Sequence, residues 1–374
     1  MQDTDEKFML LALKLAQRGM GRVEPNPAVG CVIVRDNHVI GKGWHKAFGG
    51  PHAEVNAIED CKKHGFDPAG TVMYVTLEPC CHYGKTGSCT DAIIAAGLVR
   101  VVIAAIDPSA HAQGKGAEKL RKAGIVVQTG LCQQQGRLLN AAFMKFAAAG
   151  RCWVVLKWAQ SIDGKVAWAS GSSERWISGE LSRKDAHKLR RQVGAILVGI
   201  NTVLADDPLL TPRPGMGKRP VRVVLDADLR IPPDCRLLAT AKKIPVLVVT
   251  SEQAVEQNPQ LAGQIRQKGA ELLTVPVVQG KCDLLFVLER LSGRGISRLL
   301  VEGGPTVITG FLQAGLADEA YIYITPKILG GRGNVGISQP MAAVTSDLGL
   351  YYVDVKRFGD DVRIKGLLHR LDET

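Results

Sequence analysis

The sequence predicts an α/β protein of two domains. Its 374 residues are more than one hydrophobic core usually needs. Through residues 1–149, apolar runs typical of buried strands alternate with helical segments, which favours a mainly parallel sheet with helices on its faces. A second series of apolar strands begins after the alanine-rich "FAAAGR". We therefore expect a boundary near Gly150, with domains at 1–149 and 150–374.

The elements of the first half follow from local patterns. Residues 29–45 read as two strands around a turn at Asp36 and Asn37. A helix is expected at 52–65, ended by Gly65. The remaining alternation predicts strands at 71–79, 100–108 and 125–130, and helices at 89–97, 116–124 and 132–149.

The second half restarts with the strand "CWVVLKWAQS" at 152–161. Proline and glycine predict a loop at 211–220. Neither an internal repeat nor a low-complexity tract interrupts this half. Its further short apolar strands are expected at 195–200, 221–226, 244–250, 297–304 and 319–328.

Composition narrows the class of protein. Hydrophobic residues make up 46% and charged residues 22%, as in ordinary globular proteins. The opening segment lacks the basic region of a signal peptide, and no apolar run reaches membrane-spanning length. Nine cysteines in such a chain indicate reduced thiols or metal ligands rather than disulfides. We expect a cytoplasmic protein with no membrane partner.

The net charge of +11 is compatible with nucleic acid or with phosphorylated small molecules. The basic residues form neither a dense run nor a stripe interleaved with aromatic residues. This distribution favours a small phosphorylated substrate and argues against a nucleic-acid partner.

Three residues have the types and positions of zinc ligands. His52 and Cys89 begin predicted helices, and Cys80 follows Pro79 at the end of a predicted strand. Three protein ligands leave the fourth tetrahedral position for water, as in catalytic zinc sites. Glu54, two residues after His52, is placed to carry a proton. The His-x-Glu and Pro-Cys pattern resembles that of zinc deaminases.

Other interpretations of these residues remain open. Cys81 and His82 are rival ligands, although the position directly after Pro79 favours Cys80. A solvated helix start or buried thiols would explain either motif alone. A structural zinc site would normally have four protein ligands, and no CxxC pair is present. A nucleic-acid deaminase is a further alternative.

Longer motifs resemble the bifunctional riboflavin biosynthesis deaminase–reductase family. They are "PNPAVGCVIV" (25–34), "GWHKAFGGPHAE" (43–54), "TLEPCCHYGKTGSC" (76–89), "QSIDGKVA" (160–167), "NTVLADDPLLTPR" (201–213) and "VEGGPTVITGFL" (301–312). The resemblance implies a cytidine-deaminase-like three-layer α/β/α zinc domain followed by a dihydrofolate-reductase-like α/β domain. It implies deamination of a diaminopyrimidinone ribosylamine 5′-phosphate and then reduction of its ribosyl group with NADPH. Family members commonly form homo-oligomers.

The resemblance also implies roles for individual residues. One zinc ion per chain would be bound by His52, Cys80 and Cys89, with Glu54 as the proton shuttle. Positions that match substrate contacts are Asn26, His45, His82, Lys85, Glu174, Arg190, Leu210, Arg213 and Glu302. Positions that match coenzyme contacts are Ala159, Trp176, Thr202, Asp206, Gly304, Pro305, Thr306, Val307, Ile308, Thr309 and Gly310.

Two stretches depart from the family pattern. Gly87 and Ser88 replace two prolines that usually precede the second cysteine, which predicts a less rigid loop. "GSSERWIS" carries one extra residue, so that either Ser173 or Glu174 is the substrate contact. The glycines after the strand near 301 are not a GxGxxG fingerprint, although glycines before a helix suit a pyrophosphate.

Overall fold

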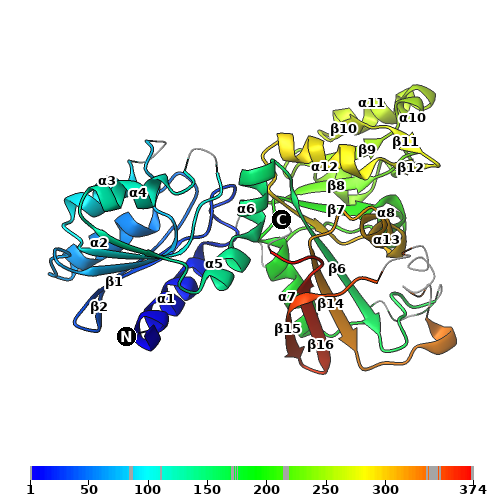
Figure 1. Cartoon of the computed structure of the whole chain (residues 1–374). Helices are drawn as coiled ribbons and strands as arrows, with labels where there is room; N and C mark the ends of the chain where they lie inside the picture. The colour runs from blue at the N-terminus through cyan, green and yellow to red at the C-terminus, as the bar shows by residue number, and fades with distance from the viewer. Residues whose placement is uncertain are drawn as a thin grey trace. The chain divides into compact units, whose positions relative to one another are not determined.

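The structure is a computed structural model that describes residues 2–83, 87–109, 112–169, 172, 174, 176–213, 219–333, 336, 344 and 347–371. The chain divides into two compact units, residues 1–150 and 151–374 (Figure 1). Every helix in the described ranges is too short or too polar to cross a membrane.

The first unit is built on a five-stranded sheet in the order β2-β1-β3-β4-β5. Its strands are β1 (Gly30–Arg35), β2 (His38–Trp44), β3 (Val72–Leu77), β4 (Arg100–Ala105) and β5 (Val126–Thr129). Its helices are α1 (Gln2–Ala16), α2 (Ala53–Lys63), α3 (Cys89–Ala95), α4 (Lys115–Lys122), α5 (Gln133–Leu139) and α6 (Ala141–Ala149), with a 3-10 turn η1 (Gln17–Gly19).

Alternation of side chains along the strands produces three layers. Cys31 and Ile33 of β1 pack in a core that includes residues of α2, α3 and α4. Val32 and Val34 point to the opposite face, where they join residues of α1 and the partly buried Leu139 of α5. The predicted α/β/α arrangement is thus confirmed.

The second unit contains a nine-stranded sheet in the order β10-β9-β8-β7-β13-β6-β14-β16-β15. The six pairings from β10 to β14 are parallel, and the last two are antiparallel. These strands are β6 (Trp153–Ser161), β7 (Ala195–Gly199), β8 (Val221–Leu225), β9 (Val246–Thr250), β10 (Glu271–Thr274), β13 (Arg298–Val301), β14 (Glu319–Thr325), β15 (Tyr351–Phe358) and β16 (Asp361–Leu367).

Helices cover this sheet because its strands are apolar on both faces. Residues of α12 and α13 pack with β6, β7 and β13 in the main core. The helices are α7 (Glu180–Arg190), α8 (Ile200–Asp206), α9 (Arg236–Ala239), α10 (Glu252–Gln257), α11 (Pro259–Gln267), α12 (Leu284–Gly293) and α13 (Pro305–Gln313). A small hairpin, β11 (Val277–Val278) with β12 (Lys281–Cys282), and a turn η2 (Gly330–Arg332) complete the described elements.

Two expectations about the fold need correction, and one element was not predicted. The first sheet is mixed, because the tight turn at Asp36 and Asn37 makes β1 antiparallel to β2, and β1 is also antiparallel to β3. The helix expected at 132–149 is divided at Asn140, whose side chain exchanges hydrogen bonds with the backbone of Ala28. The C-terminal hairpin of β15 and β16 was not predicted, because charged residues interrupt the apolar residues of both strands.

Candidate active sites

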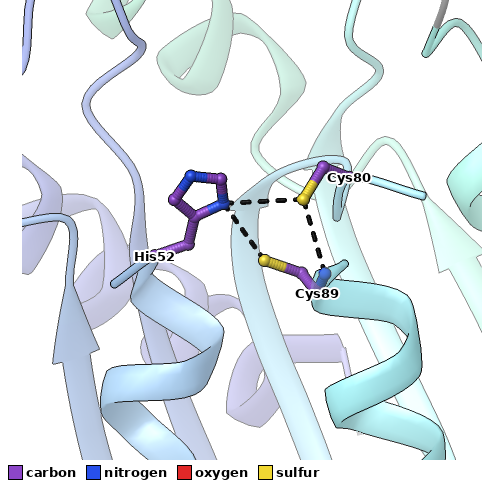
Figure 2. A group of neighbouring side chains, drawn as sticks. All are labelled: His52, Cys80 and Cys89. Atoms are coloured by element: carbon purple, nitrogen blue, oxygen red, sulfur yellow. Dashed lines mark hydrogen bonds between the residues drawn. The ribbon is translucent and has the colours of Figure 1, made fainter. Parts of the chain in front are cut away.

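In the first unit, three potential metal ligands converge beside the end of β3 (Figure 2). His52 is the residue before α2, Cys89 begins α3, and Cys80 lies in the loop after β3. His52 Nδ1 lies 3.2 Å from Cys89 Sγ and 3.5 Å from Cys80 Sγ. Gly43 permits this approach of α2, because a Cβ there would lie 2.1 Å from the carbonyl oxygen of Ala53.

The donor set fits a zinc ion. One imidazole nitrogen and two sulfurs within 4.8 Å of one another match the ligand types of catalytic zinc sites. Bonds of about 2.1 Å to nitrogen and about 2.3 Å to sulfur would place tetrahedral ligand atoms roughly 3.5 Å apart, close to the two distances from His52 Nδ1 given above. Among the described residues, neither Cys81 nor His82 joins this group, and His82 is exposed.

The two thiols ionise differently. The hydrogen bond from the Cys89 thiol lowers the pKa of Cys80 to about 4, with further help from His52 and from the Cys89 backbone N–H. The same hydrogen bond and burial raise the pKa of Cys89. Cys80 is therefore the first to become a thiolate, and metal binding would draw the proton from Cys89.

Glu54 lies in the first turn of α2 with only 3% of its surface exposed. Burial raises the pKa of its carboxyl to about 7, and the negative charge of Cys80 adds to this effect. A carboxyl group with a pKa near neutrality can both accept and return a proton.

Asn26 and His45 lie together beside the candidate ligands. The His45 ring packs edge-on against the His52 ring, with centroids 5.1 Å apart. His45 Nδ1 lies 3.1 Å from the Pro51 carbonyl oxygen, which can only accept a hydrogen bond. The other nitrogen, Nε2, is then an acceptor for the Asn26 amide at 3.4 Å. Burial lowers the pKa of His45 and favours this neutral form.

A residue that sequence reasoning missed organises this edge of the sheet. Glu78 is buried two positions before Cys80 and accepts hydrogen bonds from the backbone N–H groups of Asp107, Gly114 and Ala117. It thereby caps α4, whose own N-cap residue is glycine. In the sequence, its position in "TLEPC", two residues before Cys80, could have indicated that Glu78 belongs to the site. The predicted substrate contact Lys85 lies outside the described residues.

In the second unit, Glu302 and Arg190 form a buried ion pair at the end of β13. Arg190 donates from Nε and Nη2 to the two carboxylate oxygens at 2.8 and 2.7 Å. Burial alone would raise the pKa of Glu302, but the charges of Arg190 and Lys157 lower it to about 2. The two predicted substrate contacts, Arg190 and Glu302, therefore lie together, and the Arg190 guanidinium is paired with the Glu302 carboxylate.

Lys157 and His187 also belong to this polar group and were not predicted. Burial lowers the pKa of Lys157, partly opposed by the negative charge of Glu302. Burial, with the positive charge of Arg190, lowers the pKa of His187 to about 4. In the sequence, a lysine inside the apolar strand "VVLKWAQS" could have indicated that Lys157 belongs to a polar site. No such sign marks His187, whose role depends on the position of α7 beside Glu302.

The predicted coenzyme segment begins where β13 ends. Gly304 is the N-cap of α13, and a Cβ there would meet no atom within 4 Å. Gly303 differs, because its Cβ would lie 2.6 Å from Cβ of Val307. Gly304, with the exposed Thr306 after Pro305, therefore faces open space at a helix N-terminus, which suits an anionic group.

Three predicted contacts have buried side chains. Ile308 belongs to the hydrophobic core, and Thr309 is 4% exposed. Leu210 is 3% exposed, and its positive φ of 52° marks a tight backbone turn. Ligand contact at these three positions stays a prediction. The backbone of Leu210 lies in a loop next to Arg190, whose Nη1 donates to Thr211 O.

The other predicted positions lie in neighbouring elements of the second unit. Ala159 is in the second half of β6, and α8, which contains Thr202 and Asp206, begins after β7, the strand next to β13. Gly310 is half-buried in α13. Trp176 is 53% exposed beneath the Arg183 guanidinium. Glu174 and Arg213 are exposed, while Ser173 lies outside the described residues.

Comparisons with known proteins agree with the division of the chain into two units. Residues 152–364 match the family described as "RibD C-terminal domain", and residues 2–105 match "Cytidine and deoxycytidylate deaminase zinc-binding region". The riboflavin biosynthesis protein RibD of Aquifex aeolicus is 40% identical over 364 residues, which cover 97% of this chain and 98% of the relative. The chain belongs to the RibD family. The RibD protein of Escherichia coli is 37% identical, with 96% and 98% of the two chains covered.

Solved RibD structures have the same two-unit architecture. A Thermotoga maritima protein named as a diaminohydroxyphosphoribosylaminopyrimidine deaminase and 5-amino-6-(5-phosphoribosylamino)uracil reductase superposes with a TM-score of 0.84 at 36% identity, covering 98% of this chain and 99% of that one. RibD of Acinetobacter baumannii gives 0.83 at 34% identity, covering 99% and 100%. The chain is thus a bifunctional enzyme of riboflavin biosynthesis, with a cytidine-deaminase-like domain and a dihydrofolate-reductase-like domain.

Proposed function

We propose that the first unit deaminates 2,5-diamino-6-ribosylamino-4(3H)-pyrimidinone 5′-phosphate with one zinc ion held by His52, Cys80 and Cys89. The observation that carries this proposal is the convergence of these three ligand atoms beside the buried carboxyl of Glu54. The name of the Thermotoga relative supports the choice of substrate.

The residues around the ligands have distinct tasks in this reaction. A zinc ion, when bound, supplies the charge that makes a water molecule nucleophilic near neutral pH. Glu54 takes a proton from that water and returns it to the departing amine. The ring carbon thereby exchanges its bond to nitrogen for a bond to oxygen, and ammonia leaves. Asn26, with its amide oriented by His45, is placed to hydrogen-bond the pyrimidine.

We propose that the second unit reduces the ribosyl group of the deaminated product to a ribityl group. NADPH, when bound, would supply a hydride for C1 of the opened ribose, and a proton would complete the gain of two hydrogen atoms. The open space at Gly304 and the N-terminus of α13 support binding of the coenzyme pyrophosphate there. The charged group of Glu302, Arg190 and Lys157 supports a polar substrate at the end of β13.

One assay tests both halves. The purified protein is incubated with the diaminopyrimidinone ribosylamine phosphate, with and without NADPH, and the products are identified by mass. Without coenzyme we expect ammonia and the corresponding uracil compound. With NADPH we expect that compound to gain two hydrogen atoms. Absence of ammonia release from the zinc-loaded protein would refute the first activity, and a uracil product unchanged by NADPH would refute the second.

A further inference from the structure

The C-terminal hairpin of β15 and β16 is joined to α7 by two buried polar contacts. The first is at the start of the helix, where the N-cap is Gly179 and has no side chain to cap the exposed N–H groups. Asp361, the first residue of β16, supplies the missing acceptor. Its Oδ2 accepts hydrogen bonds from Gly179 N at 2.7 Å and Ser182 Oγ at 2.6 Å.

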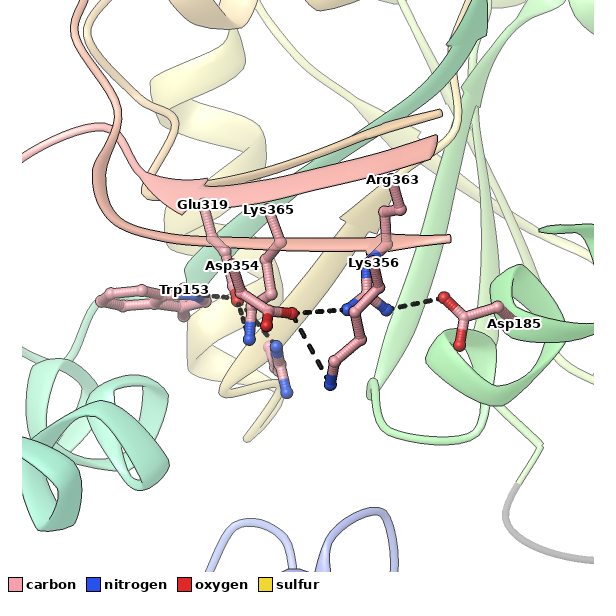
Figure 3. A network of polar contacts seen from close by, with 8 residues as sticks. Trp153, Asp185, Glu319, Asp354, Lys356, Arg363 and Lys365 are labelled. Atoms are coloured by element: carbon pink, nitrogen blue, oxygen red, sulfur yellow. Dashed lines mark hydrogen bonds and ion pairs between the residues drawn. The ribbon is translucent and has the colours of Figure 1, made fainter. Parts of the chain in front are cut away.

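The second contact is one turn further along α7. Arg363 donates from Nη1 to Asp185 at 2.7 Å and from Nη2 to Asp354 at 2.8 Å (Figure 3). Tyr323 of β14 donates to the same Asp185 oxygen at 2.8 Å. Ser182 and Asp185 are three residues apart and so lie on one face of the helix. The hairpin therefore holds both the first and the second turn of α7.

The helix held in this way connects the Arg190–Glu302 pair with Trp176, where a coenzyme contact is expected. Arg190, in its last turn, pairs with Glu302. Arg183, in its first turn, donates to the Ser178 carbonyl at 2.5 Å and lies 5.2 Å from the centre of the Trp176 ring. The backbone between Trp176 and Gly179 is thus tied to α7 on one side and to Asp361 on the other.

We propose that Asp361 is a positioning residue of the reductase, which sets the conformation of residues 176–179 and the start of α7 for coenzyme binding. Asp361 acts through Gly179 and does not touch the substrate. This inference rests on the proposed NADPH-dependent reduction and on the coenzyme contact that the sequence predicts at Trp176.

Three variants of the full-length protein separate positioning from stability. In Asp361→Ala, we expect the KM for NADPH to rise about tenfold, while kcat at saturating NADPH stays within about twofold, because two hydrogen bonds to a charged acceptor are lost. In Asp361→Asn, most of the wild-type KM should return, since both bonds use one oxygen that the carboxamide can replace. Asp360→Ala, at the exposed neighbouring position, is the control with unchanged kinetics.

Amide hydrogen exchange over residues 176–185 supplies a measurement that needs no substrate. We expect faster exchange there in Asp361→Ala and wild-type exchange in Asp360→Ala. If wild-type protein failed to oxidise NADPH, the proposed reduction would be wrong, and exchange would still decide whether Asp361 orders this segment. A lowered unfolding temperature with wild-type KM, wild-type exchange in Asp361→Ala, or failure of Asp361→Asn to restore the KM would each overturn the inference.

Discussion

Replacing Gly304 by valine should separate coenzyme binding from folding. A Cβ at Gly304 meets no atom within 4 Å, and its φ of −66° is accessible to every residue. The cost to stability is then limited to the poorer N-cap preference of valine, about 1 kcal/mol. The added side chain would occupy the space before the first turn of α13, where we place the pyrophosphate. Losing one hydrogen bond to a charged group costs about 1.5–3 kcal/mol, so we expect the KM for NADPH to rise roughly 10- to 100-fold.

The neighbouring glycine provides a matched control with the opposite behaviour. In Gly303→Ala, the new Cβ would lie 2.6 Å from Cβ and 2.9 Å from Cγ1 of Val307. Overpacking of this kind costs about 1–3 kcal/mol. This variant should therefore lower the unfolding temperature of the second unit, with a smaller effect on KM in the fraction that stays folded.

The assay follows NADPH oxidation with the deaminated substrate, alongside ammonia release from the original substrate and thermal unfolding. Deamination should be unchanged in both variants, because that site belongs to the other unit. Unchanged reductase kinetics in Gly304→Val would place the coenzyme elsewhere. A strong preference for NADH over NADPH would refute the choice of hydride donor.

Three further predictions concern the metal site, the proton shuttle and acid stability. Cys89→Ser should greatly reduce zinc content in metal analysis while Cys132→Ser retains it, and full zinc occupancy in Cys89→Ser would remove Cys89 from the ligand set. Glu54→Gln should lower deamination by at least about 100- to 10,000-fold while zinc binding and reduction persist; near-normal ammonia release would exclude Glu54 from the mechanism. Burial alone would raise the pKa of Glu319, but the charges of Lys365 and Arg298 lower it from 4.5 to about 2. The ionised Glu319 therefore stabilises the fold by about 3 kcal/mol above pH 4.5, and this stabilisation is lost as the pH falls toward 2. Acid unfolding of Glu319→Gln should accordingly depend less on pH in that range, and an unaltered pH profile would contradict this assignment.

The sequence alone was sufficient for features encoded by residues close together in the chain. Apolar runs separated by glycine marked the central strands, because burial on both faces leaves few polar positions. The convergence of three candidate metal ligands was also predictable, since His52 and Cys89 lie at helix starts and Cys80 follows a strand. Family resemblance then predicted the order of the two domains.

Only the tertiary structure decided features that depend on residues far apart. Asn140 divides a predicted helix because it bonds the backbone of Ala28, 112 positions away. The direction of β1 and the pairing of β16 with β14 depend on which strands meet in space, and the largely exposed β15 carries apolar residues that belong to no buried core. Glu78 and Asp361 show the same limit, because each caps a helix in another part of the chain whose N-cap residue is glycine. Local sequence predicts which elements form, whereas hydrogen bonds between distant segments decide where they end and what holds them in place.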